Sequence, residues 1–297
     1  MSPTVSAIVV NYNAGPLLRG CVDSLLACPE ALEIIVVDND SEDGSLDELS
    51  GLSRVHIVRN HINLGFATAC NIGVQASSAP YLLFLNPDCR FQLGALTSLL
   101  SGLNSDSRAG MVGGLLVNED GTEQGGARRA VPTPWRSLVR VFGLHRFANR
   151  WPKLFYDFYL HKEPLPTTPV EIEAISGACM LVKRDAMMDV GLWDEGYFLH
   201  CEDLDWCMRF RQKGWKILFV PDARIDHALG ACSRSRRVFV EWHKHKGMVR
   251  FYRKFFRAQY PGALMWLVMF GVWLRFGLIA IYLTARRVFD VLNLTRG

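Results

Sequence analysis

The sequence predicts an α/β fold in which helices flank a mostly parallel sheet. Short apolar runs rich in β-branched residues recur in the first 120 residues, and such runs are typical of strands buried on both faces. Segments with helical periodicity separate these runs, as parallel strands require. Several runs end in Asn or Asp, which would lie at the carboxyl edge of the sheet, where α/β proteins bind ligands.

Four strands and two helices are expected in the first 90 residues. The strands share an apolar centre, and they cover residues 5–10, 34–37, 55–58 and 81–85. The first helix should begin at Gly15-Pro16 and end before Pro29. Its apolar face should consist of Leu17, Cys21, Leu25 and Cys28. The second helix should open within residues 63–66 and end near residue 77.

The pattern is less regular after residue 110. Residues 111–117 and a turn at 118–121 suggest a hairpin. Residues 122–168 are rich in aromatic side chains but lack sustained periodicity, so we expect a variable excursion over the mouth of a site. Beyond it, the sequence predicts a strand at 172–182, a helix at 202–213 and a strand at 215–220 that ends before Pro221.

Charge is distributed unevenly along the chain. Residues 1–230 carry 20 Lys and Arg against 27 Asp and Glu, which gives −7. Residues 231–257 carry nine against one, and residues 258–297 carry four against one, which gives +8 and +3. We therefore expect a large acidic domain at 1–230 and a basic C-terminal unit at 231–297, whose residues 236–257 should form a helix.

Residues 262–285 form an apolar segment interrupted by one charge, Arg275. As a helix it would extend roughly 36 Å, enough to cross a hydrocarbon core of about 30 Å. Arg275 would cost on the order of 2.5 to 3.5 kcal/mol, which the Leu, Ile, Phe and Trp side chains offset. The segment predicts membrane association. It lacks a polar face, so an amphipathic helix lying on the membrane surface is the weaker description, and a helix packed in the core is the alternative. The preceding basic residues would stay on the cytoplasmic side and favour anionic lipid over nucleic acid as partner.

The eight cysteines show no CxxC pair and no zinc-ligand spacing, and the N-terminus does not resemble a signal peptide. Reduced thiols in the cytosol are the simplest interpretation. Cys89 and Cys201 adjoin two acidic clusters, but a small buried side chain is a more common role there than a nucleophile.

Those two clusters, about 115 residues apart, carry most of the functional signal. Asn86-Pro87-Asp88 closes the strand at 81–85, where a carboxylate can face a ligand. Glu202-Asp203 opens the helix at 202–213 and could supply a general base. Structural roles are the alternatives, because strand-end carboxylates are common and acids in a first helical turn complement the helix dipole.

The order and spacing of eight short motifs resemble family-2 glycosyltransferases, which have a GT-A fold with a Rossmann-like sheet, and especially the bacterial branch that includes rhamnosyltransferases. The resemblance covers about residues 5–230. The motifs are VVNYN at 9–13, VVDN at 36–39, NLGF at 63–66, LNPD at 85–88, SGAC at 176–179, GLWDE at 191–195, EDxD at 202–205 and DH at 226–227.

This resemblance implies that a nucleotide sugar binds across the ends of the first strands. Asp38 would accept hydrogen bonds from the ribose or base, although an Asx-turn or helix cap also places an Asp there. Gly65 would permit close approach near the nucleotide, and Asn63 could equally be an N-cap. The implied donor site consists of Asn11, Asn13, Asp38, Asn39, Asn63, Gly65, Asn86 and Asp88.

Asp88 takes the place of the last carboxylate in the family's DxD motif, which holds Mg²⁺ or Mn²⁺ against the diphosphate. Asn86 replaces the first carboxylate and so removes one charged ligand. His227 occupies a position that contributes to the metal or diphosphate site in some relatives. We therefore expect Asp88 and His227 as metal ligands, while a surface histidine is the alternative for His227.

Glu202-Asp203 resembles the family's ED motif, whose second acid is the usual base in inverting members. Displacement at the anomeric carbon needs the acceptor hydroxyl deprotonated on the face opposite the leaving group. We expect Asp203 as the base and Glu202 as a group that orients the acceptor or its loop. Trp193 and Asp194 should form an acceptor platform, with a core position as an equal alternative for Trp193.

The resemblance implies a membrane-associated inverting glycosyltransferase at the cytoplasmic face of the inner membrane. Its donor would be dTDP-L-rhamnose and its acceptor a cell-envelope glycan or a polyprenyl-linked sugar, with a UDP-hexose or another nucleotide sugar as the alternative donor. A non-catalytic nucleotide-sugar-binding protein is disfavoured by Asp88, Asp203 and His227. A nucleotide-dependent oxidoreductase is excluded because the first strand lacks a GxGxxG turn.

Overall fold

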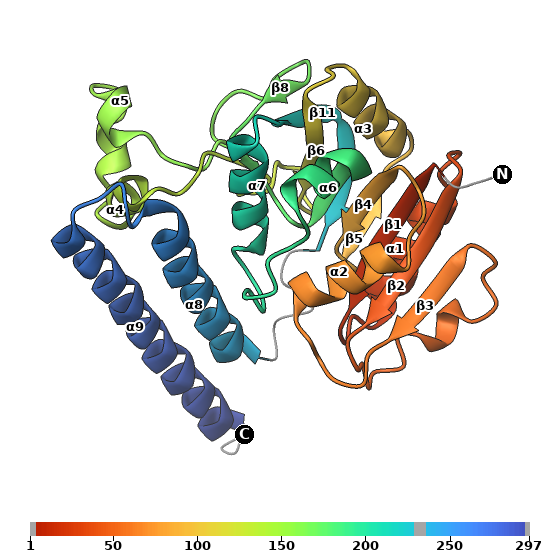
Figure 1. Ribbon diagram of the computed structural model, residues 1–297. Coiled ribbons are helices and arrows are strands. Elements are labelled where there is room, and N and C mark those ends of the chain that lie inside the picture. Colours follow the sequence, from red (N-terminus) through yellow and green to blue (C-terminus); the bar gives the residue numbers. More distant parts are fainter. Residues whose placement is uncertain (1–3, 229–235, 295–297) are drawn as a thin grey trace.

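A large mixed sheet organises the computed structural model, which describes residues 4–228 and 236–294 (Figure 1). In these residues the sheet has nine strands in the order β3-β2-β1-β4-β10-β6-β11-β5, with β8 paired to β11. The strands are β1 Val5–Asn11, β2 Leu32–Asp38, β3 Val55–Arg59, β4 Tyr81–Leu85, β5 Cys89–Phe91, β6 Ala109–Val117, β8 Val170–Glu171, β10 Cys179–Lys183 and β11 Lys216–His227. Two further strands, β7 Arg128–Arg129 and β9 Ala174–Ile175, pair with each other.

The N-terminal half of this sheet is parallel. β1 pairs with β2 on one side and with β4 on the other, and β2 pairs with β3, all in parallel. β10 enters antiparallel between β4 and β6, while β6 and β11 are again parallel. The predicted α/β fold is therefore confirmed, but the sheet is mixed, because four of its strand pairings in the described residues are parallel and four are antiparallel.

Helices cover both faces of the sheet. Side chains alternate along β1, so that Ile8 and Val10 join one buried cluster with α2, α6 and α7, whereas Ala7 and Val9 join a second cluster with α1 and α3. The helices are α1 Pro16–Leu26, α2 Phe66–Gln75, α3 Ala95–Asn104, α4 Pro134–Val141, α5 Pro152–Phe155, α6 Arg184–Val190, α7 Glu202–Gln212, α8 Arg237–Phe256 and α9 Gly262–Leu294, with 3₁₀ turns η1 Asp47–Leu49 and η2 Leu144–Phe147.

The buried face of α1 differs from the predicted one. Leu17 is only partly buried, and Cys28 lies beyond the end of the helix at Leu26. Cys21 and Leu25 were predicted correctly, whereas Leu17 lies about 100° around the helix from Leu18 and so falls at the edge of the buried face. The buried residues of α1 are Leu18, Cys21, Val22 and Leu25.

Pro221 does not end the strand predicted at 215–220, because β11 continues to His227. The register between β11 and β6 shifts between Val220 and Arg224, and such a bulge accommodates a proline within a strand. The continuation allows β5 to pair with β11, with His227 opposite Cys89.

The irregular middle of the chain follows the prediction only in part. The turn at 118–121 is present, since the Gly121 N–H donates to the Asn118 carbonyl, but the returning strand of the hairpin is reduced to one bridge between Val117 and Glu123. The predicted strand at 172–182 is divided into β9 and β10. Within the excursion at 122–168, residues 134–155 form α4, η2 and α5, which lie near α8 and α9 (Figure 1).

The C-terminal unit contains the basic helix predicted at 236–257, observed as α8, and α9 packs along it. The rings of Trp242 and Trp273 lie 5.2 Å apart, and Arg275 Nη1 lies 2.9 Å from His245 Nε2. Residues Gly262–Arg287 are long and apolar enough to cross a membrane, which for one helix is weak support by itself. Only 17% of the most apolar window is buried, so the alternative of a core helix does not describe α9.

Candidate active site

Asp88 and His227 lie together at the edge of the sheet because β5 pairs with β11. His227 Nε2 is 3.3 Å from Asp88 Oδ1, and each side chain is only 6% exposed. The Ala228 N–H also donates to the Asp88 carbonyl at 3.0 Å, which fixes the two segments against each other. The structure thus brings both expected metal ligands to one place, and His227 is not a surface residue.

Gln124 sets the orientation of the His227 ring. Its Oε1 lies 2.5 Å from His227 Nδ1, and because an amide oxygen only accepts, Nδ1 is the donor of this contact and Nε2 is the ring nitrogen that faces Asp88. The Gln124 amide nitrogen donates to Asn118 Oδ1 at 3.1 Å, which is consistent with this orientation. A histidine held through its other nitrogen is typical of metal sites.

Cys89 completes a compact group of potential ligand atoms with Asp88 and His227, all within 4.8 Å of one another. Burial, followed by the charge of Asp88, raises the pKa of the Cys89 thiol well above its ordinary value. A protonated thiol is a poor ligand for a hard cation, which prefers oxygen. The donor set that fits a divalent cation is therefore the Asp88 carboxylate with His227 Nε2.

Asp203 lies in the first turn of α7, where three donors orient its carboxylate. Arg129 Nη2 and the Gly177 N–H both contact Oδ2, the latter at 3.1 Å. The Leu204 N–H donates to Oδ1 at 2.8 Å. The carboxylate is thus held by specific partners beyond the general effect of the helix dipole.

Glu202 is the more buried of these two neighbouring acids. Its Oε2 has no hydrogen-bond partner among the described residues. Burial, followed by the negative charge of Asp203, raises the pKa of Glu202 to about 8. A carboxyl group that keeps its proton near neutral pH can donate a hydrogen bond, whereas Asp203 accepts three. The two acids are therefore suited to different tasks.

The segment 176–179 connects the two acidic clusters. The Gly177 N–H donates to Asp203, while the carbonyl of the next residue, Ala178, accepts the Asn86 N–H at 2.9 Å. A side chain at Gly177 would meet Asp203 Cβ at 3.2 Å. One short segment thus contacts both Asp203 and the backbone of Asn86, two residues before Asp88, and so connects the two clusters.

The loops after β1 and β2 are joined by a polar network. Asn11 Nδ2 donates to Asp38 Oδ1 at 2.7 Å, and the Ser41 N–H donates to Asp38 Oδ2 at 3.1 Å. Asn13 Oδ1 accepts the Glu42 N–H at 2.9 Å. Asp38 therefore also has the turn-forming role named as its alternative. Asn11 Oδ1 is buried without a hydrogen-bond partner in the described chain, which leaves an acceptor at this edge.

Asn39, Asn63 and Gly65 shape the loop before α2. Asn39 Nδ2 donates to the Gly65 carbonyl at 3.2 Å, and Asn63 Oδ1 accepts the Gly65 N–H at 2.9 Å. Asn63 is not the N-cap, because that position is Gly65. A Cβ on Gly65 would lie 2.6 Å from the Phe198 carbonyl. The chain's own backbone thus requires glycine here, and the contact of this loop with a nucleotide stays a prediction.

Trp193 belongs to the core. It is 2% exposed, and its ring lies 4.2 Å from that of Trp206 and 5.2 Å from that of Phe84. The alternative named for this residue therefore describes it, and a buried indole does not provide an acceptor platform.

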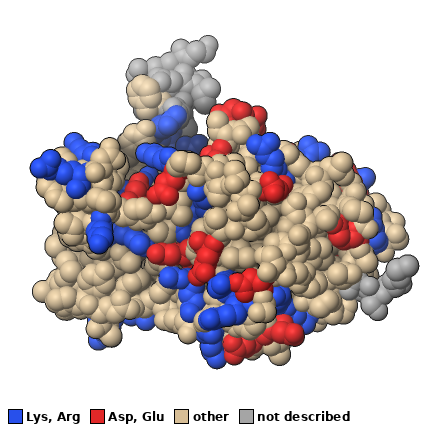
Figure 2. Space-filling view, turned by 90° about the horizontal axis from the view of Figure 1, so that it is seen from above, with Lys and Arg blue, Asp and Glu red and all other residues tan. Residues whose placement is uncertain are grey.

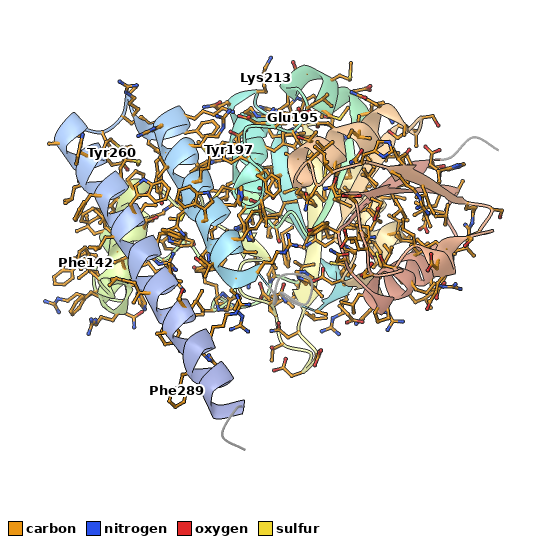
Figure 3. All side chains as sticks on the ribbon, turned by 90° about the horizontal axis from the view of Figure 1, so that it is seen from below. Phe142, Glu195, Tyr197, Lys213, Tyr260 and Phe289 are labelled. Carbon is orange, nitrogen blue, oxygen red and sulfur yellow. The ribbon has the colours of Figure 1, made fainter. Side chains whose placement is uncertain are left out.

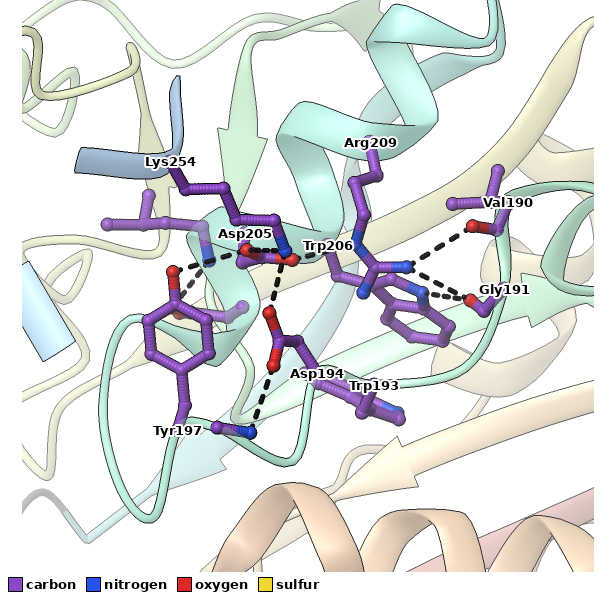
Figure 4. Close-up of polar contacts among 12 residues, drawn as sticks. Val190, Gly191, Trp193, Asp194, Tyr197, Asp205, Trp206, Arg209 and Lys254 are labelled. Carbon is purple, nitrogen blue, oxygen red and sulfur yellow. Dashed lines mark hydrogen bonds and ion pairs between the residues drawn. The ribbon is translucent and has the colours of Figure 1, made fainter. Parts of the chain in front are cut away.

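Asp194 binds α8 and is not left free for a ligand (Figure 4). It accepts from Lys254 Nζ at 2.7 Å and from Arg250 Nη2 at 2.8 Å. Burial acts to raise the pKa of Asp194, but hydrogen bonds from Lys254, the Gly196 N–H and Arg250 outweigh it and lower that pKa to about 2. Lys254 also pairs with buried Asp205 at 2.6 Å. These contacts join α8 to the acidic domain.

Sequence reasoning missed Arg129 and Gln124. Both lie in the part of the chain that lacks periodicity, so nothing placed them on a particular face. The available signal was the pair Arg128-Arg129 within an acidic domain, but the two behave differently. Arg128 pairs with Glu123 at 2.8 Å, whereas Arg129 reaches Asp203.

The chain is similar to known proteins in sequence and in fold. A model of the family described as Glycosyl transferase family 2 matches residues 6–191. The chain is 30% identical to the N-acetylglucosaminyl-diphospho-decaprenol L-rhamnosyltransferase of Mycobacterium tuberculosis over 76% of each chain. It is 22% identical to the dTDP-rhamnosyl transferase RfbF of Shigella flexneri over 77% of this chain and 71% of that one.

A solved structure shows the same fold. It is the mannosyltransferase PcManGT from Pyrobaculum calidifontis in complex with GDP-Man and Mn2+, which aligns with a TM-score of 0.58. The alignment covers 91% of this chain and 68% of that one at 16% identity. At this identity the likeness concerns the fold alone.

Proposed function

The chain belongs to glycosyltransferase family 2, and from this premise we propose that it transfers L-rhamnose from dTDP-rhamnose to a lipid-linked or other cell-envelope glycan, with inversion. The names of two rhamnosyltransferase relatives support the choice of sugar, and one of those names contains a diphospho-decaprenol acceptor. The observation that carries the proposal is the pairing of Asp88 with His227, together with the contacts of Gly177 with Asp203 and of Ala178 with the Asn86 backbone.

The donor would lie along the carboxyl edge of the parallel strands. A divalent cation, Mn²⁺ or Mg²⁺, held by Asp88 and His227 would neutralise charge on the departing nucleoside diphosphate. With Asn86 in place of an acid, this site has one carboxylate less than a DxD site, so its metal affinity should be modest. The base and ribose would contact the network of Asn11, Asn13, Asp38 and Asn39 and the loop of Asn63 and Gly65.

Asp203 would act as the general base and take the proton of the acceptor hydroxyl as its oxygen attacks the anomeric carbon. Glu202, whose pKa is raised to about 8, would donate a hydrogen bond to the acceptor or its loop. Arg129 is a positioning residue, because it acts on the reaction through the carboxylate of Asp203.

Membrane association would bring the enzyme to a lipid-linked acceptor. We propose that α9 contacts the bilayer and that the exposed residues Arg237, Lys246 and Arg253 of α8 face anionic lipid at the cytoplasmic surface. The apolar length of residues 262–287 supports this placement.

The test is transfer by the purified full chain with dTDP-, UDP- and GDP-sugars, Mn²⁺ or Mg²⁺, and a polyprenyl-diphosphate sugar. We expect dTDP to be released from dTDP-rhamnose when acceptor is present, and release by Asp203→Asn to fall by about 10² to 10⁴. Asp222→Asn, which changes an exposed acid on β11, is the control. Release of UDP or GDP in its place would replace the donor assignment, and undiminished turnover by Asp203→Asn would mean that another group is the base.

A further inference from the structure

Residues 134–155, here called the interfacial segment, combine exposed aromatic side chains with basic ones. The segment carries five Lys and Arg and no Asp or Glu. Phe142 is 64% exposed, and other large apolar side chains of the segment are also exposed. These are Trp135, Val141, Phe147, Trp151 and Leu154. A soluble domain rarely leaves so many large apolar groups in water without a partner.

The interfacial segment is a folded element. Thr133 caps α4 by accepting the Arg136 N–H at 3.2 Å, and Trp135 Nε1 donates to the Leu154 carbonyl at 2.7 Å. Ser137 Oγ and the Tyr252 hydroxyl, 2.6 Å apart, join α4 to α8. The exposed side chains therefore point outward from a fixed support.

The interfacial segment and α9 occupy the same end of the molecule, opposite β3 (Figures 1 and 3). Phe142 of the segment and Phe289 of α9 both extend outward there (Figure 3). Seen from above, Lys and Arg are visible at the edge of that end without Asp or Glu beside them (Figure 2). The outer face of α9 is uncharged over several turns, and it consists of Trp266, Phe270, Leu274, Leu278, Ile281 and Tyr282.

The contacts of α8 restrict how α9 can meet a bilayer. Arg250 and Lys254 of α8 bind Asp194 of the acidic domain, and α9 is held to α8 by Arg275 and His245. If α9 crossed the membrane in this arrangement, the charged side chains of α8 would enter the hydrocarbon, which is costly. With α9 in the plane of the interface, only its outer apolar face is buried.

We propose that the interfacial segment and the outer face of α9 form one docking surface that lies flat on an anionic lipid membrane, with α9 in the plane of the interface. Tryptophan and phenylalanine side chains would enter the headgroup region, and Arg146, Arg150 and Lys153 would contact lipid phosphates. No acidic side chain pairs with these three in the described chain. The inference rests on the proposed function for its lipid-linked acceptor and adds a second membrane contact within the catalytic domain.

The first test uses the full chain with vesicles of phosphatidylcholine and phosphatidylglycerol in equal parts. Phe142→Cys carries a polarity-sensitive fluorophore, and Leu93→Cys, at a position 95% exposed between β5 and α3, carries the same label as a control. We expect the emission at 142 to shift to the blue and to be quenched by brominated lipid, with no change at 93. A label at 142 that stays in water while the chain floats with vesicles would overturn the proposal.

The orientation of α9 is tested with labels at Leu267→Cys and Leu274→Cys, which lie on one face about 10.5 Å apart along the helix, the second near the middle of the apolar stretch. If α9 lies in the plane, lipids brominated at one depth should quench both labels equally. A large difference in depth would show that α9 crosses the bilayer and would contradict this part of the proposal. If the emission at 142 shifts to the blue without vesicles as the protein concentration rises, the surface contacts a second copy of the chain. That result would also contradict the proposed membrane contact.

The basic contribution is tested by changing Arg146, Arg150 and Lys153 together to Ser. The triple variant should bind the mixed vesicles more weakly at low salt, by about fivefold for each charge that is removed. Its binding to pure phosphatidylcholine should not change. Arg59→Ser, on β3 at the opposite end, is the control. Equal affinity of the triple variant and the native chain for mixed vesicles would refute the anionic contact. Transfer measured in detergent separates the two proposals, because a native chain that transfers sugar in detergent but does not bind mixed vesicles contradicts the docking surface alone.

Discussion

The guanidinium of Arg129 contacts the same oxygen of Asp203 that accepts the backbone N–H of Gly177. Both side chains are largely buried, with exposures of 18% for Arg129 and 15% for Asp203. Salt screens such a pair less than it screens a surface pair. The contact therefore fixes the position of the proposed base next to a second acid, Glu202.

Arg129→Met should lower kcat by about 10-fold to 100-fold, because the carboxylate of Asp203 loses the side-chain donor that fixes its position. The KM for the sugar nucleotide should change little, since Arg129 is assigned no contact with the donor. Arg129→Lys should recover part of the loss in kcat, because it returns a donor. A rise in KM with unchanged kcat, or an equal loss in Arg129→Lys and Arg129→Met, would contradict the assignment.

Glu202 should make the protein less stable as the pH rises. Its pKa is raised in the folded chain from 4.5 to about 8, so between these values the folded chain keeps a proton that the unfolded chain has lost. The free energy of unfolding therefore falls with rising pH across this window. Glu202→Gln, which carries no charge, should flatten the dependence of the urea midpoint on pH, while Glu48→Gln at an exposed site should not. Parallel curves for Glu202→Gln and the native chain would show that the carboxyl ionises freely.

The parallel half of the fold was predictable from the sequence, because its information is local. The apolar run at 81–85 marks β4 by composition alone, and its polar end places Asp88 at the ligand edge. The partner of Asp88, His227, was harder to predict from local sequence pattern. His227 reaches it only because β11 passes Pro221 through a bulge and then pairs with β5. The resemblance to a family suggested His227 as a ligand, whereas local pattern ended that strand too early.

The buried polar side chains of the site were harder to predict from the sequence. Arg129 and Gln124 lie in a segment whose fold depends on long-range partners, namely Asp203 and His227. Trp193 and Asp194 illustrate the converse. Their motif was recognised, but the structure assigns the first to the core and the second to the contact with α8. A motif locates a segment near the site, but the packing of the chain determines which side chains of that segment can contact a ligand.

Gln124→Ala should weaken the binding of Mn²⁺ by about 10-fold to 100-fold, because the ring of His227 loses the acceptor that keeps Nε2 directed at Asp88. The dissociation constant is measured by titration of the full chain with Mn²⁺ in the absence of any sugar nucleotide, so that the result does not depend on turnover. Gln75→Ala, at the exposed end of α2, is the matched control. Equal affinities for Gln124→Ala and the native chain would mean that His227 does not bind the metal or does not need Gln124 to do so.

Gly65→Ala should destabilise the chain more than Gly94→Ala, although both glycines have positive φ. Gly94, with φ 80° and ψ −6°, has open space around it, so its substitution should cost only the left-handed conformation, about 1–2 kcal/mol. Gly65 has φ 85° and ψ 171°, a region almost confined to glycine, and a Cβ there would also meet the Phe198 carbonyl. We expect an additional loss on the order of 2 kcal/mol in the free energy of unfolding. Because relief of this contact displaces the loop at 63–66, Gly65→Ala should also bind dTDP more weakly than Gly94→Ala, and equal values for both quantities would show that the loop adjusts without cost.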